Sequence, residues 1–116
     1  MMPPPRPASV LDVYQEIATL TDDMLAAARA GDWGLVLACG QRYCEWVEQL
    51  RRIDPVAPLD EAGREIKYEL LVRILDNDAA TRDLAIPQMA RLSELLGRMK
   101  RQQSLLSAYG ARASIA

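Results

Sequence analysis

The chain lacks histidine and phenylalanine altogether, and it has only two cysteines among its 116 residues. Without histidine, the Ser-His-Asp and Cys-His catalytic pairs, the imidazole ligand of zinc and the side chain that titrates nearest neutral pH are all missing. Two cysteines cannot build the disulfide network of a small secreted protein. The sequence therefore predicts no catalytic residues, no metal site and no cofactor, and an enzyme is the least favoured class.

Long hydrophobic runs are also missing. No stretch reaches the roughly 18 apolar residues of a membrane-spanning helix, so no membrane insertion is expected. The start MMPPPRPAS lacks the apolar segment of a signal peptide, which favours a cytoplasmic location. The segment RMKRQQ is one short basic patch in an acidic chain without a series of stacking aromatics, so direct binding of nucleic acid is not expected either.

Half of the residues are apolar and 26% are charged, as in a folded protein. Ala and Leu, which favour helices, are abundant. We predict an all-α fold, an antiparallel bundle of three to four helices, with the fourth helix either fixed or mobile. The predicted organisation is a disordered proline-rich tail over 1–8, a single helical domain over 9–110 and a flexible C-terminus over 111–116.

Apolar residues recur every three or four positions on both sides of Gly31 and Asp32, which predicts two amphipathic helices. The first is predicted to start at Ser9, which can cap it, and to end at Gly31, which can adopt a positive φ. Asp32 can cap the second, which is about twenty residues long by the same periodicity. Because almost no linker separates them, the two helices should form a tight antiparallel hairpin with Trp33 anchoring the turn.

The second predicted helix contains both cysteines and a glycine. Cys39 and Cys44 are five residues apart, which separates their side chains by about 140° around a helix, so they cannot chelate one ion together. We interpret them as buried or half-buried structural thiols. In the middle of a helix, Gly40 is about 1 kcal/mol less stable than Ala would be. The close approach of another backbone would explain why a glycine is present there.

A third helix is predicted to begin at Asp60 or Glu61. The segment DNDAAT starts like a calcium loop, but its fifth and sixth positions are Ala80 and Thr81 where a ligand and a glycine are needed, so the helix should continue through it. Within that continuation, Asp78 and Arg82 are expected to form a surface ion pair worth about 0.3–0.5 kcal/mol.

The apolar surface of this third helix is unusually broad. Ile66, Leu70 and Ile74 form one stripe. Leu71 and Leu75 form a second stripe about 100° away. The first stripe can pack on the helical hairpin, so the second needs another partner.

Pro87 suits the first turn of a fourth helix, which is predicted to end at Gly110. From Pro87 onward there are five basic residues and one acidic residue. The apolar side of this helix includes Leu92, Leu96, Met99, Leu106 and Tyr109. Such a helix can cover the second stripe either as a permanent wall of the bundle or as a mobile cover that competes with a partner, and both alternatives stay open.

Three arginines and a glutamate near the junction of the second and third helices could line an enzyme pocket of the kind found in helical mutases. Their spacing does not force them to converge, so solvated helix faces explain them better. These residues are Arg51, Arg52, Arg64 and Glu65.

Four motifs follow one another along the predicted helices: GDW at the hairpin, ILDND on the third helix, then LSELLG and RQQSLLSAYG on the fourth. In this order the chain resembles the FliT-type flagellar export chaperones over nearly all of its length after the tail. The resemblance implies an all-helical protein of the bacterial cytosol, not an enzyme, that binds the filament-cap protein FliD before type III flagellar export. It also implies contact with the export ATPase complex and, as in some members, inhibitory binding to the flagellar regulator FlhDC.

In that family the surface of the third helix takes part in partner binding and the last helix can mask it. Carried onto this sequence, the binding positions are Leu71, Leu75 and Arg82, and the predicted fourth helix is the regulatory element. The residue pattern supports this independently, because a groove at the second stripe would accept an amphipathic helix. The alternative hypothesis is a structural module that forms a homodimer through the same surface.

Overall fold

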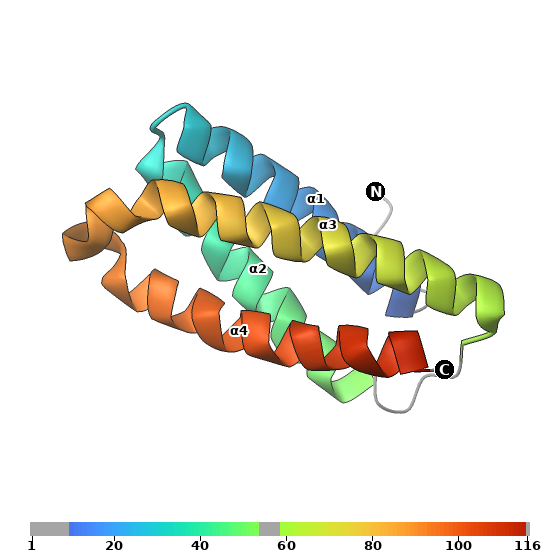
Figure 1. Ribbon diagram of the computed structural model, residues 1–116. Coiled ribbons are helices and arrows are strands. Elements are labelled where there is room, and N and C mark those ends of the chain that lie inside the picture. The colour runs from blue at the N-terminus through green and yellow to red at the C-terminus, as the bar shows by residue number, and fades with distance from the viewer. Residues whose placement is uncertain (1–9, 54–58, 116) are drawn as a thin grey trace, which may run out of the picture.

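Over the residues that the structure describes, the chain forms four α-helices and no strand (Figure 1). The computed structural model describes residues 10–53 and 59–115, and the side chains among these except at 89–91 and 111–115. The elements are α1 Val10–Arg29, α2 Trp33–Ile53, α3 Glu61–Ala85, the short 3-10 helix η2 Ile86–Gln88, and α4 Met89–Ile115. The all-α prediction is confirmed, whereas Ser9 and the proline-rich tail over 1–8 lie outside the described residues.

Consecutive helices run in opposite directions, and the chain turns back at alternating ends of the bundle (Figure 1). Helix α1 packs on α2 and α3, while α4 packs on α3 and α2. The largest fully buried side chains come from all four helices, so they share one apolar core. None of the described helices combines the length and the apolar character that a membrane crossing requires.

The hairpin between α1 and α2 has the predicted geometry. Gly31 has a φ of +74°, the left-handed conformation that only glycine adopts without strain. The N–H of Asp32 donates to the carbonyl of Ala27 at 2.9 Å, and the Asp32 carboxylate accepts from the N–H of Leu35 at 3.2 Å. Trp33 is half-buried against the core. One residue therefore ends α1 and the next one caps α2.

Gly40 is required by a side chain and not, as predicted, by another backbone. A Cβ atom at this position would lie 2.7 Å from Cδ1 of Leu95, which reaches across from α4. Cys39 and Cys44, on the same helix, are both free and buried, as predicted. Burial raises the pKa of both thiols, which keeps them protonated and chemically inert at neutral pH.

The ends of the last two helices confirm one prediction and correct another. Asp60 caps α3 by accepting from the N–H of Gly63 at 2.7 Å, and α3 continues to Ala85 through the segment that resembled a calcium loop. Helix α4 does not end at Gly110 but continues to Ile115. A glycine weakens a helix without stopping it, and Gly110 faces α3, where a Cβ would lie 3.7 Å from Leu71 Cδ1.

The hairpin gives a direct test of the turn. Gly31→Ala should lower the free energy of unfolding by about 1 kcal/mol, because a side chain at positive φ is strained although nothing lies near it. Urea denaturation followed by circular dichroism measures the change. Gly34→Ala, three residues later inside α2 and with no close contact, is the matched control and should be neutral or slightly stabilising. Equal stabilities of the two variants would contradict this account of the turn.

Candidate functional site

The second apolar stripe of α3 lies against α4. Leu71 is 1% exposed, and its Cδ1 atom meets Gly110 of α4. Leu75 is half-buried and packs against the same core. Two of the three predicted binding residues are therefore involved in closing the bundle. A partner that contacted Leu71 would have to take the place of α4.

The first apolar stripe of α3 is buried only in part. Leu70 and Ile74 are buried as predicted, but Ile66 is 46% exposed, so that its predicted place in the stripe is wrong. The reason is helical geometry, since each step of four residues turns the side chain by about 40° around the axis. Over two such steps, the stripe rotates from the core at Ile74 to solvent at Ile66.

The apolar side of α4 is mostly buried. Leu92, Met99, Leu106 and Tyr109 belong to the core, whereas Leu96 is only half-buried. Leu95, which sequence reasoning missed, is buried between them and fills the space over Gly40 on α2. Its position three residues after Leu92 and four before Met99 is the signal that would have identified it.

A buried polar group joins α2 to α3 beside the predicted site. Asp78 has no exposed surface, accepts a hydrogen bond from the Tyr43 hydroxyl at 3.1 Å and one from Arg82 Nε at 2.9 Å. Burial raises the pKa of the Asp78 carboxyl, and the neighbouring Arg82 opposes that rise. The prediction of a surface ion pair is wrong on the Asp78 side. No local spacing reveals this contact, because Tyr43 lies 35 residues from its partner.

A second polar cluster fastens α3 to α1. Arg73 forms an ion pair with Asp22, and Asn77 donates to the same carboxylate at 2.6 Å and to the Thr21 hydroxyl at 3.2 Å. The hydrogen bond from Arg73 lowers the pKa of Asp22. These contacts hold the side of α3 that faces away from Leu75.

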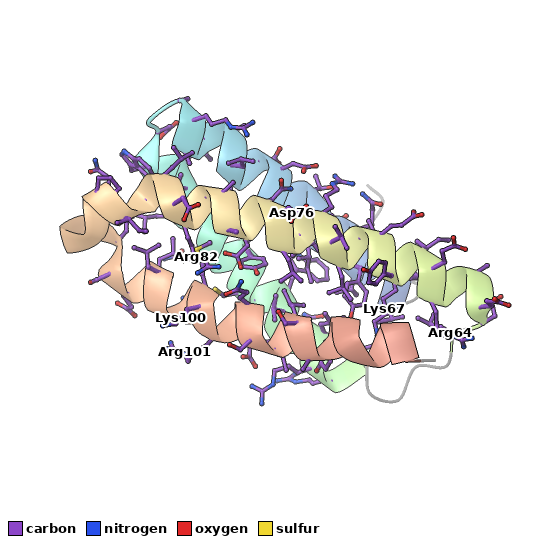
Figure 2. The ribbon with its side chains drawn as sticks, viewed as in Figure 1. Arg64, Lys67, Asp76, Arg82, Lys100 and Arg101 are labelled. Carbon is purple, nitrogen blue, oxygen red and sulfur yellow. The ribbon has the colours of Figure 1, made fainter. Side chains whose placement is uncertain are left out.

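Lys67 connects three helices near the beginning of α3 (Figure 2). Its side chain is 8% exposed, and Nζ lies 5.6 Å from the ring centroid of Tyr14 on α1 and 5.8 Å from that of Tyr109 on α4. Both distances fall in the range of cation–π attraction. This contact holds the C-terminal half of α4 to the bundle.

The four residues that could line an enzyme pocket make local contacts or face solvent. Arg51 pairs with Glu48 on the surface of α2, and Arg64 donates to the carbonyl of Leu59 at 2.9 Å. Arg52 and Glu65 are exposed. Among the described residues, no three His, Cys, Asp or Glu side chains come together as a metal site would require. The candidate functional features are thus surfaces of α3 and α4.

Comparisons with known proteins agree on one family. The model of a family described as flagellar protein FliT matches residues 11–111. Flagellar protein FliT of Cronobacter sakazakii is 32% identical over 102 residues, covering 88% of this chain and 84% of that protein. The Yersinia enterocolitica protein of the same name is 31% identical over 101 residues, covering 87% and 84%.

A solved structure is also similar. The crystal structure of flagellar protein FliT from Bordetella bronchiseptica matches with a TM-score of 0.64 and 63% sequence identity. The match covers 75% of this chain and 98% of that one. Sequence and architecture therefore agree.

The buried carboxylate predicts a pH-dependent effect. Arg82→Gln should lower the free energy of unfolding by about 2 kcal/mol at about pH 7.5, because it leaves the Asp78 carboxylate buried without its cation. The loss should shrink as the pH falls to about 5. In the variant the folded-state pKa of Asp78 rises further above its unfolded value, so the folded protein binds the extra proton and recovers stability.

Urea denaturation at both pH values measures the difference. Arg51→Gln removes an exposed pair on α2 and is the matched control, with an expected change within about 0.5 kcal/mol at either pH. If Arg82→Gln lowers the free energy of unfolding no more than Arg51→Gln does, or by the same amount at both pH values, the Asp78 carboxylate does not need this partner.

Proposed function

We propose a function for this chain, which belongs to the FliT family of flagellar proteins. It is a cytoplasmic export chaperone that holds the filament-cap protein FliD before type III export. The binding surface is the stripe of α3 at Leu71 and Leu75, and α4 is its removable cover. The observation that carries this proposal is the burial of Leu71 under α4. A client helix with a similar apolar face can take the place of α4.

The polar contacts of α3 support a division into a fixed part and a cover. Asp22, Arg73 and Asn77 fasten α3 to α1. Helix α4 meets α3 mainly through apolar side chains and through the contact of Tyr109 with Lys67, and the three residues Ile86–Gln88 connect the two helices. Moving α4 away would leave the α1–α3 contacts intact and expose an apolar stripe, which is the kind of surface that binds an amphipathic helix.

Arg82 lies at the edge of this stripe and can contribute a charge. Its Nε atom donates to Asp78, which orients the guanidinium, and its side chain is 22% exposed. The remaining N–H groups of the guanidinium are suited to a carboxylate on the client. Arg82 therefore both compensates the buried Asp78 and presents a donor beside Leu75.

The export ATPase complex and the regulator FlhDC are the further partners that we assign to this chaperone. A competition binding experiment with FliD tests whether these partners use the same surface, because a partner that binds the stripe at Leu71 must exclude FliD. A homodimer formed through the stripe, the alternative function, would likewise require α4 to leave, because Leu71 is already buried within one chain.

The proposed surface predicts a specific loss of binding. Leu75→Asp should weaken FliD binding by at least about tenfold, because a carboxylate at the centre of an apolar contact must be desolvated. Leu75 is only half-buried, so the variant should remain folded. Leu84→Asp, at an exposed position of the same helix, is the matched control and should bind normally. Isothermal titration calorimetry provides the affinities, and normal binding by a folded Leu75→Asp protein would contradict the proposed site.

The cover predicts a gain of binding. Leu106→Ala removes a fully buried contact of α4, which should raise the fraction of chains with α4 displaced and tighten apparent FliD affinity in proportion. Ile17→Ala removes a fully buried contact of α1 and controls for general loss of stability. The same calorimetry, with circular dichroism to confirm folding, checks both. If Leu106→Ala binds FliD no better than Ile17→Ala, α4 is a permanent wall of the bundle.

A further inference from the structure

The outward face of α3 presents apolar side chains that no described helix covers. Tyr68 is 48% exposed and Val72 is 40% exposed. They are four residues apart, so they lie on one face of the helix. Exposed apolar residues that occur singly need no explanation, but a stripe at helical spacing is a contact surface for another helix.

Acidic side chains border this stripe on the side away from α4. Glu65, Glu69 and Asp76 are all exposed, and their positions place them on one side of the helix. Asp76 lies on the outer face about midway along α3 (Figure 2). None of the ion pairs found among the described residues includes any of the three.

The basic residues of the same part of α3 are directed to other partners. Arg64 donates to the Leu59 carbonyl, Arg73 pairs with Asp22, and Lys67 is buried between two aromatic rings. The acidic border is therefore not neutralised by its own helix.

Two basic residues of α4, Lys100 and Arg101, lie toward the other end of the bundle. Figure 2 shows Lys100 and Arg101 level with Arg82, toward the turn between α3 and α4, whereas Lys67 and Arg64 lie near the beginning of α3. No ion pair found among the described residues joins Lys100 or Arg101 to the acidic border. The acidic border remains available to a partner.

We propose that this outer face of α3 binds a basic amphipathic helix of a partner protein. Tyr68 and Val72 contact the apolar stripe of the partner helix, and Glu65, Glu69 and Asp76 pair with lysines or arginines along its flank. The face is about three helical turns long, which is enough for a short docked helix. It is accessible with α4 in place, so this second contact goes beyond the proposed FliD surface and can be occupied at the same time.

The test uses the full chain and a synthetic peptide of about 18 residues, with leucines along one helical face and lysines on its flanks. Fluorescence anisotropy of the labelled peptide gives the affinity. Tyr68→Ser/Val72→Ser and Glu65→Lys/Glu69→Lys should each weaken binding about tenfold or more, and raising the salt from about 50 to about 300 mM should weaken binding to the wild type. Circular dichroism confirms that these surface variants are folded.

Two controls separate this contact from general attraction to an acidic protein. Leu35→Ser/Glu45→Lys makes the same kinds of change at exposed positions of α2 and should leave binding unchanged. A peptide of the same composition with its leucine stripe scrambled should bind much more weakly. Equal binding of the wild type and the α3 variants, or of the two peptides, would overturn the proposal.

Two further readouts distinguish this contact from others. FliD affinity should be unchanged in Tyr68→Ser/Val72→Ser, so failure of the proposed FliD surface at Leu75 and failure of the outer face are detected separately. Analytical ultracentrifugation of the chain alone should give the same oligomeric state for wild type and variant. A change of state on substituting Tyr68 and Val72 would assign the face to self-association and overturn the proposal.

Discussion

The contact between α4 and Leu71 on α3 is the interaction on which the rest of the structure depends. Helix α4 packs on both α3 and α2, and five of its described apolar side chains are buried in the core: Leu92, Leu95, Met99, Leu106 and Tyr109. Full burial of each such side chain is worth roughly 1.5–3 kcal/mol, which exceeds the net value of a single hydrogen bond. The contact of α4 with the rest of the bundle is therefore mainly apolar.

Several polar contacts of α3 join it to α1 and α2 without involving α4. Asp22 of α1 forms an ion pair with Arg73 and accepts a hydrogen bond from Asn77, both on α3. An apolar client cannot replace these directional contacts. Asp78 links α3 to α2 through Tyr43 and leaves Arg82 oriented at the edge of the stripe. Buried charges that have lost their partner are costly, which favours a scaffold of α1 to α3 that remains intact.

Helix α3 thus has two surfaces with different chemistry. Its inner stripe is apolar, with Leu71 buried and Leu75 half-buried. Its outer face, at Tyr68 and Val72, is permanently accessible and bordered by acids. A protein that must accept one partner and release it to another can use such an arrangement, because a contact at one surface need not displace the contact at the other.

Most helix ends can be predicted from the amino-acid sequence, because caps and turns act through neighbouring residues: Gly31 and Asp32 at the hairpin and Asp60 at α3 are examples, whereas the predicted end of α4 at Gly110 is wrong. The order of four motifs indicated the family, which the comparisons confirm. The rotation of each helix about its axis, and the side chains that cover it, follow from tertiary packing, because contacts such as that between Asp78 and Tyr43 join residues far apart in the chain. For that reason three features could be seen only in the packed helices: the burial of Asp78, the outward rotation of Ile66 and the place of Leu95 against Gly40.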